Sequence, residues 1–283
     1  MTTPRTPDGR ITAQQNELDT LTYIHRFGWL RSRDLAALIW HDSKHIESGI
    51  AMAQRTLRRL KKAGQILTRI APDGASVYAL SESGARRLGD YCGTIARSGK
   101  DLLRELGNYQ HRCNANLFAI QQINAGRNVW TEREIQANLA PIKVVTHKIP
   151  DGLVDVTDGL YAEGTLALAW LESERGYKKN SDFYKMMTFI YKILGQLDSQ
   201  GLPTNTIFCA ADGVYIEQVF IQIMNEKQLA RIINAVRAEK SGNPYGYDWQ
   251  KIGSQLLLVG LQGTSHPISR VLTEKIELEN NSM

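Results

Sequence analysis

The first third of the chain repeats apolar residues every three or four positions in three successive segments, the period that places them on one face of a helix. A glycine follows two of these segments, Gly28 after the first and Gly64 after the third, as is common where a helix ends. Ser32 stands before the second segment and is predicted to be its N-cap. We therefore expect three helices, at Asn16–Phe27, Arg33–Trp40 and Ile46–Ala63.

The pattern changes to alternation after the third helix. Gln65–Ile70 and Ser76–Leu80 are typical of strands, and Ala71-Pro72-Asp73-Gly74 between them has the residue types of a turn. Ser81-Glu82-Ser83-Gly84 then begins another helix. Three helices followed by a β-hairpin is the order of elements in a winged helix-turn-helix, which we predict for residues 1–88.

The rest of the chain mixes helical and strand patterns. Residues 89–106 are predicted to be a linker, and residues 107–283 an α/β domain, so the whole chain combines α+β and α/β parts. The expected order is one helix, three strands, a helix and a strand, then a further helix and strand. The predicted helices are 108–125, 179–197 and 226–240, and the predicted strands are 128–135, 147–156, 165–171, 206–210 and 255–260. A short terminal helix is expected after residue 265.

Composition narrows the class of protein. With 42% hydrophobic and 22% charged residues, 283 residues are too apolar for a disordered chain and sufficient for a large core. No apolar run approaches the roughly 18–20 residues of a membrane span. The first ten residues lack the apolar stretch of a signal peptide. The three scattered cysteines, Cys92, Cys113 and Cys209, are expected to be buried, reduced thiols, and we predict a cytoplasmic protein.

The net charge of +5 belongs to the first third of the chain. Residues 1–106 hold 17 basic and 11 acidic residues, whereas the remainder holds 17 basic and 18 acidic. A basic unit on a near-neutral body indicates a polyanionic partner. In the third predicted helix, four cations share one face: Arg55, Arg58, Arg59 and Lys62.

In a helix-turn-helix this third helix enters the major groove of double-stranded DNA, where arginine pairs with guanine edges and lysine with phosphates. The turn between the two strands contains no arginine, so we do not expect it to bind the minor groove. A merely solvated basic face, or a winged helix that binds protein, remains an alternative.

Acidic residues stand where the predicted strands of the α/β domain would bring them together. Asp151 lies in the second strand, and Glu172 and Glu174 follow the third on one face, because side chains alternate along a strand. Carboxylates of this kind hold the Mg²⁺ or Mn²⁺ ions that promote phosphodiester cleavage. A nearby lysine, Lys178 first, could stabilise the developing charge.

Pro150-Asp151, followed about 20 residues later by Leu171-Glu172-Ser173-Glu174, resembles the PD-(D/E)XK nuclease fold. The resemblance implies that Asp151 and Glu172 bind the metal, with Glu174 joining them. That family places a lysine two residues after the acid, where this chain has Glu174. Either the lysine has moved to the next helix, with Lys178, Lys179 and Lys185 as candidates, or catalysis has been lost.

The whole chain resembles a narrower group. A basic winged helix joined to His111-Arg112-Cys113-Asn114-Ala115-Asn116 and to the acidic segments is similar to the plasmid replication-relaxation family and the related MobC-type mobilisation relaxases. The resemblance covers roughly residues 15–200. It implies binding at a plasmid or integrative-element origin, nicking of one strand, and other transfer or replication proteins as partners. His111 and Asn114, one helical turn apart, and Glu134 could approach the same site.

The leading hypothesis is therefore a DNA-binding, relaxase-like protein that makes a metal-dependent single-strand nick. Water, or a tyrosine such as Tyr177 or Tyr184, would be the nucleophile. The rival hypothesis is a non-catalytic DNA-binding regulator, or a replication or transfer accessory protein, with an inactive nuclease-like domain. Glu174 in place of lysine favours the rival, and the acidic cluster favours the enzyme.

Overall fold

The computed structural model describes residues 8–93, 95–104, 106, 108–143, 148–157, 163–173, 179–194, 209–210, 213–237, 254–259 and 265–267. They form a mixed α and β structure, as expected from the sequence. The chain divides into two compact units, residues 1–110 (unit 1) and residues 111–283 (unit 2). Within the described stretches, no helix is both long and apolar enough to span a membrane.

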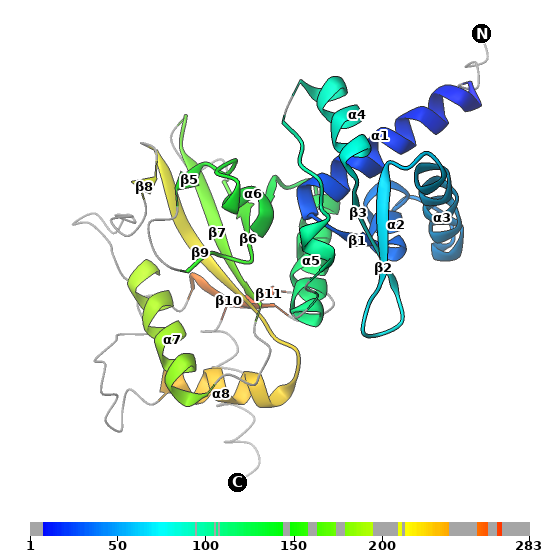
Figure 1. Ribbon diagram of the computed structural model, residues 1–283. Coiled ribbons are helices and arrows are strands. Elements are labelled where there is room, and N and C mark those ends of the chain that lie inside the picture. The colour runs from blue at the N-terminus through cyan, green and yellow to red at the C-terminus, as the bar shows by residue number, and fades with distance from the viewer. Residues whose placement is uncertain are drawn as a thin grey trace, which may run out of the picture. The chain divides into compact units, whose positions relative to one another are not determined.

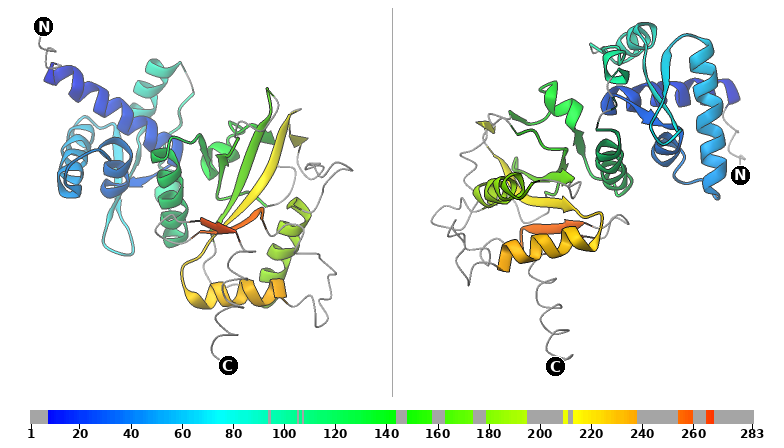
Figure 2. Two further views of the ribbon diagram at one scale, coloured as in Figure 1. Left: turned by 180° about the vertical axis from the view of Figure 1, so that it is seen from behind. Right: turned by 60° about the horizontal axis from the view of Figure 1, so that its bottom comes forward.

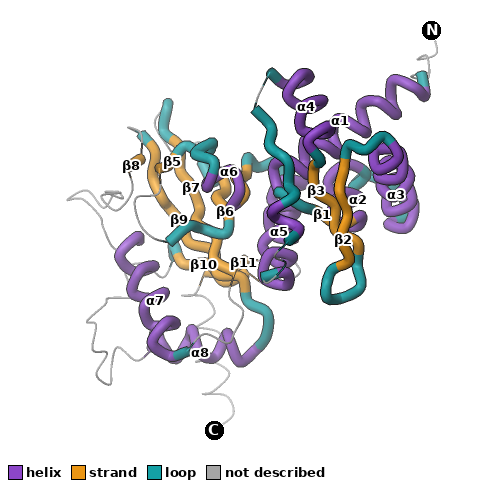
Figure 3. Tube along the Cα trace, viewed as in Figure 1, coloured by secondary structure: helices purple, strands orange, loops and turns teal. Residues whose placement is uncertain are grey.

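Unit 1 packs helices against a three-stranded antiparallel sheet in the order β1-β3-β2 (Figures 1 and 3). Leu21, Leu35, Leu57 and Val77, from three helices and the central strand, are each at most 1% exposed and form part of its core. Its elements are α1 (Gly9–Phe27), β1 (Leu30–Arg31), α2 (Ser32–Ile39), α3 (Ile46–Lys62), β2 (Ile66–Ile70), β3 (Ser76–Leu80), α4 (Glu82–Cys92) and the 3₁₀ helix η1 (Asp101–Leu103).

The three predicted helices and the hairpin are present, with two corrections at helix starts. Helix α1 begins at Gly9 rather than Asn16, because Asp8 caps it by accepting a hydrogen bond from the Arg10 N–H. Ser32 is the first residue of α2 and not its N-cap. Arg31 holds that position, and the Asp34 carboxylate accepts both its backbone N–H, at 2.9 Å, and its guanidinium, at 2.8 and 2.9 Å.

The start of α4 explains the Ser-Glu-Ser-Gly segment. Ser81 is the N-cap: its hydroxyl oxygen accepts from the Gly84 N–H at 3.1 Å and donates to the Gly64 carbonyl at 2.6 Å. A Cβ on Gly84 would lie only 2.0 Å from the Gln65 carbonyl oxygen, so only glycine allows this approach. The cap therefore joins the end of α3 to the start of α4. Cys92, at the end of α4, is exposed, whereas Cys113 is buried as expected.

Residues 89–106 were predicted to be a linker, but residues 89–92 are the last residues of α4, and the described residues after them belong to unit 1 and bond to its sheet. Ser98 and Gly99 donate to the carbonyl of Leu80 at 3.2 and 2.9 Å. Arg69, on β2, donates to the carbonyls of Leu103 and Arg104. The described part of this segment is thus bonded to both strands of the β2–β3 hairpin.

Unit 2 is built on a six-stranded mixed sheet in the order β11-β10-β9-β7-β6-β4. Strands β4, β6 and β7 pair antiparallel, β7, β9 and β10 pair parallel, and β11 is antiparallel to β10. Its elements are α5 (Tyr109–Asn124, whose first two residues belong to unit 1), β4 (Val129–Thr131), α6 (Glu132–Gln136), β5 (Ile142–Lys143), β6 (Gly152–Asp155), β7 (Leu166–Ser173), α7 (Asn180–Leu194), β8 (Cys209–Ala210), β9 (Val214–Gln222), α8 (Glu226–Arg237), β10 (Leu256–Val259) and β11 (Ser265–Pro267).

Helices cover both faces of this sheet (Figures 1 and 2). Helices α7 and α8 share one apolar core with the sheet, in which Trp170 of β7 is fully buried. Helix α5 covers the other face, where Phe118 meets Phe220 of β9 edge to face with ring centroids 5.4 Å apart. The longest strands, β7 and β9, lie side by side at the centre of the sheet, and residues 167–173 of β7 are all buried.

Two features of unit 2 differ from the sequence predictions. The strand expected at 128–135 stops at Thr131, because Thr131 and Glu134 form a capping box that begins α6. Strand β9 was not predicted at all. The terminal helix expected in the tail after residue 265 lies mostly outside the described residues, and at Ser265–Pro267 the chain forms β11, which pairs with β10.

Candidate functional site

The basic face of α3 is the candidate polyanion surface of unit 1. Arg55, Arg58 and Lys62 are exposed along this helix, whose other face buries Ala53, Leu57 and Leu60 in the core. The opposition follows from the helical period, which gives the cations one side and the apolar residues the other. Three of the four predicted DNA-binding residues therefore share an accessible face.

Arg59, the fourth, is engaged within unit 1. Its Nε donates to the Glu17 carboxylate of α1 at 3.0 Å, and its side chain is 40% exposed. Glu17 also accepts from Arg87 of α4 at 3.0 Å, and Arg87 donates to the Gln65 amide oxygen at 2.6 Å. Arg59 is thus one part of an ion-pair network that joins three helices.

The turn of the hairpin is held by a tyrosine from the end of unit 1. The Tyr109 hydroxyl donates to the Asp73 carboxylate at 2.9 Å, and the Tyr109 ring stacks on Trp29 with centroids 5.5 Å apart. The pKa of Asp73 is lowered, chiefly because its carboxylate accepts the Ala75 N–H, with further contributions from Tyr109 and nearby arginines. The Asp73–Tyr109 pair gives this turn one fixed side-chain partner.

The candidate catalytic site of unit 2 lies at one end of β6 and β7. Gly152 pairs with Leu171 in the antiparallel register, so Asp151 just before β6 and Glu172 near the end of β7 come to neighbouring positions. The sequence predicted Asp151 within the strand, but it lies just before β6. Its N–H donates to the Leu171 carbonyl at 3.0 Å. Both side chains are largely buried, at 13% and 7% exposed. The two acids that the sequence singled out are therefore neighbours.

Asp151 is held by a histidine and by a backbone amide. His111 Nε2 lies 2.8 Å from Asp151 Oδ1, and the Ser173 N–H donates to Oδ2 at 2.7 Å. Burial lowers the pKa of His111, but the hydrogen bond to Asp151 and the charges of Asp151, Glu172 and Glu132 outweigh it. The net result is a raised pKa. His111 therefore belongs to the acidic site, as the sequence suggested.

The lysine at this site is Lys148, which sequence reasoning did not identify. Its Nζ lies 2.8 Å from Glu172 Oε1 and 5.5 Å from the ring centroid of Phe189 on α7. Lys148 lies 24 residues before Glu172, on the irregular segment that leads to Asp151. No local motif marks that position, and only the strand pairing brings the two together.

The other predicted site residues divide into four groups. Glu174, Tyr177 and Lys178 lie outside the described residues. Lys179 and Tyr184 are exposed, and Lys185 is 81% exposed and 3.8 Å from Asp182 on the same helix. Glu134 caps α6 instead of ending a strand. Asn114 contributes its main-chain carbonyl, which accepts from Gln222 at 3.1 Å.

Asp151 and Glu172 supply the hard oxygen donors that Mg²⁺ and Mn²⁺ prefer, and Mg²⁺ is often held by only one or two protein carboxylates. These residues therefore fit a divalent cation. Among the residues that the structure describes, no three His, Cys, Asp or Glu side chains group closely enough to hold a metal ion. Any third protein ligand would have to come from elsewhere, and Glu174 follows Glu172 by two residues.

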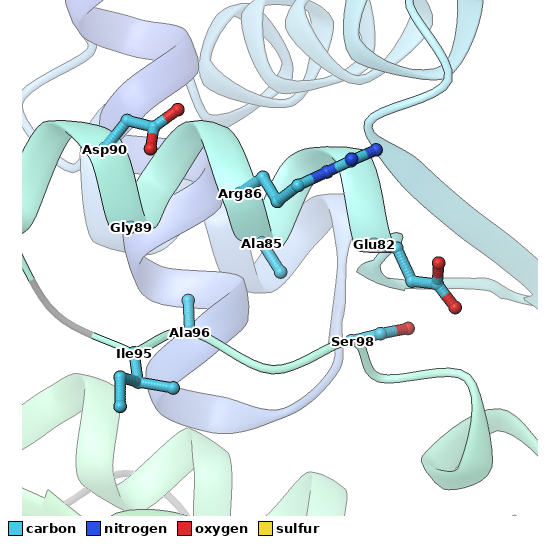
Figure 4. A pocket seen from close by; sticks show the side chains of 8 residues that line it. All are labelled: Glu82, Ala85, Arg86, Gly89, Asp90, Ile95, Ala96 and Ser98. Carbon is cyan, nitrogen blue, oxygen red and sulfur yellow. The ribbon is translucent and has the colours of Figure 1, made fainter.

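Unit 1 also has a shallow pocket of about 480 Å³ between α4 and residues 95–98. Figure 4 shows that the charged groups of Glu82, Arg86 and Asp90 point in different directions and do not converge on one point. A binding pocket normally places a few polar groups around a common ligand position. This pocket therefore adds no candidate chemistry.

Comparison of the chain with protein-family models, with curated proteins and with solved structures finds no match in any of the three. The features that indicate a function are therefore the basic face of α3 in unit 1 and the Asp151–Glu172 pair in unit 2.

Proposed function

We propose that the protein binds double-stranded DNA through unit 1 and cuts one strand, with a divalent cation, at the Asp151–Glu172 site of unit 2. The observation that carries the proposal is that these two acids lie side by side, each with a basic partner. Asp151 lies 2.8 Å from a ring nitrogen of His111, and Glu172 lies 2.8 Å from the ammonium group of Lys148. Burying a carboxylate costs free energy even when a neighbouring basic group compensates it. Two such carboxylates in one site therefore favour a functional role.

The order of elements in unit 1 supports the DNA-binding part. Helices α1, α2 and α3 followed by the β2–β3 hairpin, with β1 completing the sheet, agree with the winged helix-turn-helix expected from the sequence. In that fold the third helix is the recognition helix, and here it exposes Arg55, Arg58 and Lys62. The target we propose is an origin region of a plasmid or integrative element, as the family resemblance implies.

The strand order of unit 2 supports the nuclease part. Five strands lie side by side in the sheet in the same order as along the chain: β4, β6, β7, β9 and β10. Strand β6 is antiparallel to both of its neighbours, and helices cover both faces of the sheet. A PD-(D/E)XK-like domain is expected to have this arrangement. Lys148 takes the place of the expected lysine, although it comes from the segment before Asp151. Its distance from Glu172 is the distance of a direct ion pair.

In this mechanism Asp151 and Glu172 would hold the divalent cation, which supplies charge neutralisation at the scissile phosphate when bound. Lys148 would donate a hydrogen bond from its ammonium group to a phosphate oxygen, where negative charge develops, and would keep its proton. His111 holds a proton at Nε2 against Asp151 Oδ1 and, with the Ser173 N–H, fixes the direction of that carboxylate. The low exposure of both acids limits competing water.

The test is conversion of supercoiled plasmid carrying the element's origin to open circle, with Mg²⁺ or Mn²⁺. Asp151→Asn should lower nicking about a hundredfold to a thousandfold, the usual cost of one charge-stabilising group, and leave DNA binding unchanged. The matched control is Asp155→Asn, the same substitution at the other end of β6. Equal nicking by Asp151→Asn and wild type would place the active site elsewhere.

The second candidate function is a non-catalytic DNA-binding regulator, or a replication or transfer accessory protein. It is favoured by the ion pairs that already engage both acids and by Glu174 at the position where the nuclease family has lysine. Tight origin binding without nicking by wild type, in the presence of either cation and of the element's other transfer proteins, would establish this alternative.

A further inference from the structure

Two fully buried polar side chains lie next to the candidate site and have no role in the mechanism above. Ser173, at the end of β7, is 2% exposed, and Gln222, at the end of β9, is 1% exposed. The residues before Gln222 are Val219, Phe220 and Ile221, which are buried and apolar. Burying an amide among apolar side chains costs free energy unless its hydrogen bonds are made, so Gln222 calls for an explanation.

The partners of Gln222 determine which way its amide points. Its Nε2 donates to the main-chain carbonyl of Asn114 at 3.1 Å, and a carbonyl can only accept. The amide oxygen therefore faces Ser173, whose hydroxyl donates to it at 2.9 Å. One amide thus joins helix α5 to strand β7 through strand β9.

These bonds close a ring with the site itself. The Ser173 N–H donates to Asp151 Oδ2 at 2.7 Å, and Asp151 Oδ1 lies 2.8 Å from His111 Nε2. His111 and Asn114 are three residues apart on α5 and so lie on the same side of the helix. The sequence of partners runs from Asn114 through Gln222, Ser173 and Asp151 to His111, and α5 completes it.

We propose that Gln222 and Ser173 are positioning residues that fix α5 along β7, so that His111 and Asp151 stay within hydrogen-bond distance. Apolar contacts such as Phe118 with Phe220 hold the helix against the sheet but tolerate sliding, because the hydrophobic effect has no direction. Hydrogen bonds to a buried amide are directional, so the helix cannot slide along the sheet without breaking them. The expected change in nicking rests on the proposed function. The expected change in the hydrogen bond between His111 and Asp151 does not.

The first variant is Gln222→Leu, and its matched control is Gln228→Leu. Gln228 is 4% exposed in the same unit and accepts the Met224 N–H at 2.6 Å, outside the ring. The ¹⁵N resonances of the His111 ring, recorded at one fixed pH without cation, report its hydrogen bond to Asp151. We expect them to shift in Gln222→Leu and to stay at the wild-type position in Gln228→Leu. Nicking kcat should fall about tenfold to a hundredfold, as for other residues that orient a site, with KM for DNA nearly unchanged.

A double variant keeps the test decisive if Gln222→Leu unfolds. Ser173→Ala with Gln222→Leu removes both side-chain partners, which is better tolerated than leaving one of them buried alone. We expect its melting temperature to recover toward wild type while the His111 resonances and kcat stay altered. Wild-type His111 resonances in the folded double variant, or an equal shift in Gln228→Leu, would overturn the positioning role. Absence of nicking by wild type would refute the proposed function but leave the His111 comparison to decide this inference.

Discussion

The two units treat charge in opposite ways. On α3 of unit 1, Arg55, Arg58 and Lys62 are exposed and the helix is held by its apolar face. In unit 2, Asp151 and Glu172 are largely buried, with the His111 ring nitrogen 2.8 Å from the first and the Lys148 ammonium 2.8 Å from the second. An exposed cation costs the fold little and can meet any polyanion, whereas a buried carboxylate must be compensated in place. Substitutions that remove a charge from α3 should therefore change the affinity for DNA. Substitutions that remove a charge from the Asp151–Glu172 site should change the stability of the protein and its nicking activity.

The largest effect on stability is expected from Lys148. Lys148→Met removes the ammonium partner of the buried Glu172 carboxylate and should lower the free energy of unfolding by about 2 kcal/mol, the range for hydrogen bonds to charged groups. Urea unfolding followed by circular dichroism measures this change. Lys185→Met is the control, because Lys185 is 81% exposed on α7.

Lys148→Met combined with Glu172→Leu should recover much of the lost stability, because the second substitution removes the uncompensated charge. An equal loss in the single and double variants would show that Lys148 contributes through packing alone.

The next effect concerns DNA affinity and unit 1. Arg58→Ala should weaken binding of the origin by about 1–3 kcal/mol and leave the unfolding free energy within about 0.5 kcal/mol of wild type. Fluorescence anisotropy at two salt concentrations measures the affinity and the number of phosphate contacts. Arg86→Ala, an exposed arginine on α4, is the matched control. Unchanged affinity for Arg58→Ala would exclude α3 as the recognition helix.

A smaller effect distinguishes the two arginines that are neighbours on α3. Because Arg59 pairs with Glu17, Arg59→Ala should lower the unfolding free energy by less than about 1 kcal/mol and change DNA affinity much less than Arg58→Ala. The same anisotropy and urea measurements test both variants. Equal losses of affinity would mean that Arg59 leaves Glu17 to bind DNA.

The smallest effect concerns pH and the hairpin turn. A carboxyl group with a lowered pKa in the folded protein contributes stability above its ordinary pKa, and this contribution is lost as the pH falls through the folded value. Tyr109→Phe removes one donor from Asp73, so the variant should be slightly less stable than wild type at neutral pH. The difference should be present above 3.8, the ordinary pKa of this group, and should disappear only as the pH falls below that value through the lowered pKa of the folded protein. Thermal melts across that range give the comparison, and a difference that is independent of pH would exclude the Asp73 charge as its cause.

The sequence predicts elements well where one local period continues without interruption. Helix α3 and the β2–β3 hairpin lie almost at their expected bounds, because apolar spacing and turn residues are local signals. Strand β9 was missed although it is nine residues long. Its register shifts between Leu168 and Ala169 of β7, where Ile216 and then Gln218 are the partners, so Glu217 is an extra residue. That bulge places two partly exposed residues, Glu217 and Gln218, in succession and so interrupts the alternation typical of a strand.

The site shows the same division between local and distant information. Asp151 and Glu172 were predicted because Asp151 was placed in one strand-like segment and Glu172 at the end of the next. Lys148 could not be predicted, since its partner is 24 residues away and the alternation expected at 147–156 does not show which distant residue this lysine will meet. Glu134 was misplaced because the Thr131–Glu134 capping box, which the sequence does contain, was interpreted as a strand.

The parallel pairing of β7 with β9 has a consequence for how the protein is made. Residues 166–173 pair with β6 on one edge, but the partner of their other edge is residues 214–222, so a long stretch of chain must close before the centre of the sheet exists. Unit 1, by contrast, forms its hairpin from strands five residues apart and leaves the ribosome first. During synthesis of residues 174–213, the apolar strand Leu166–Leu171 has one edge without its β9 partner. The segment that carries Glu172 is thus also the one most exposed to misassembly before the chain is complete.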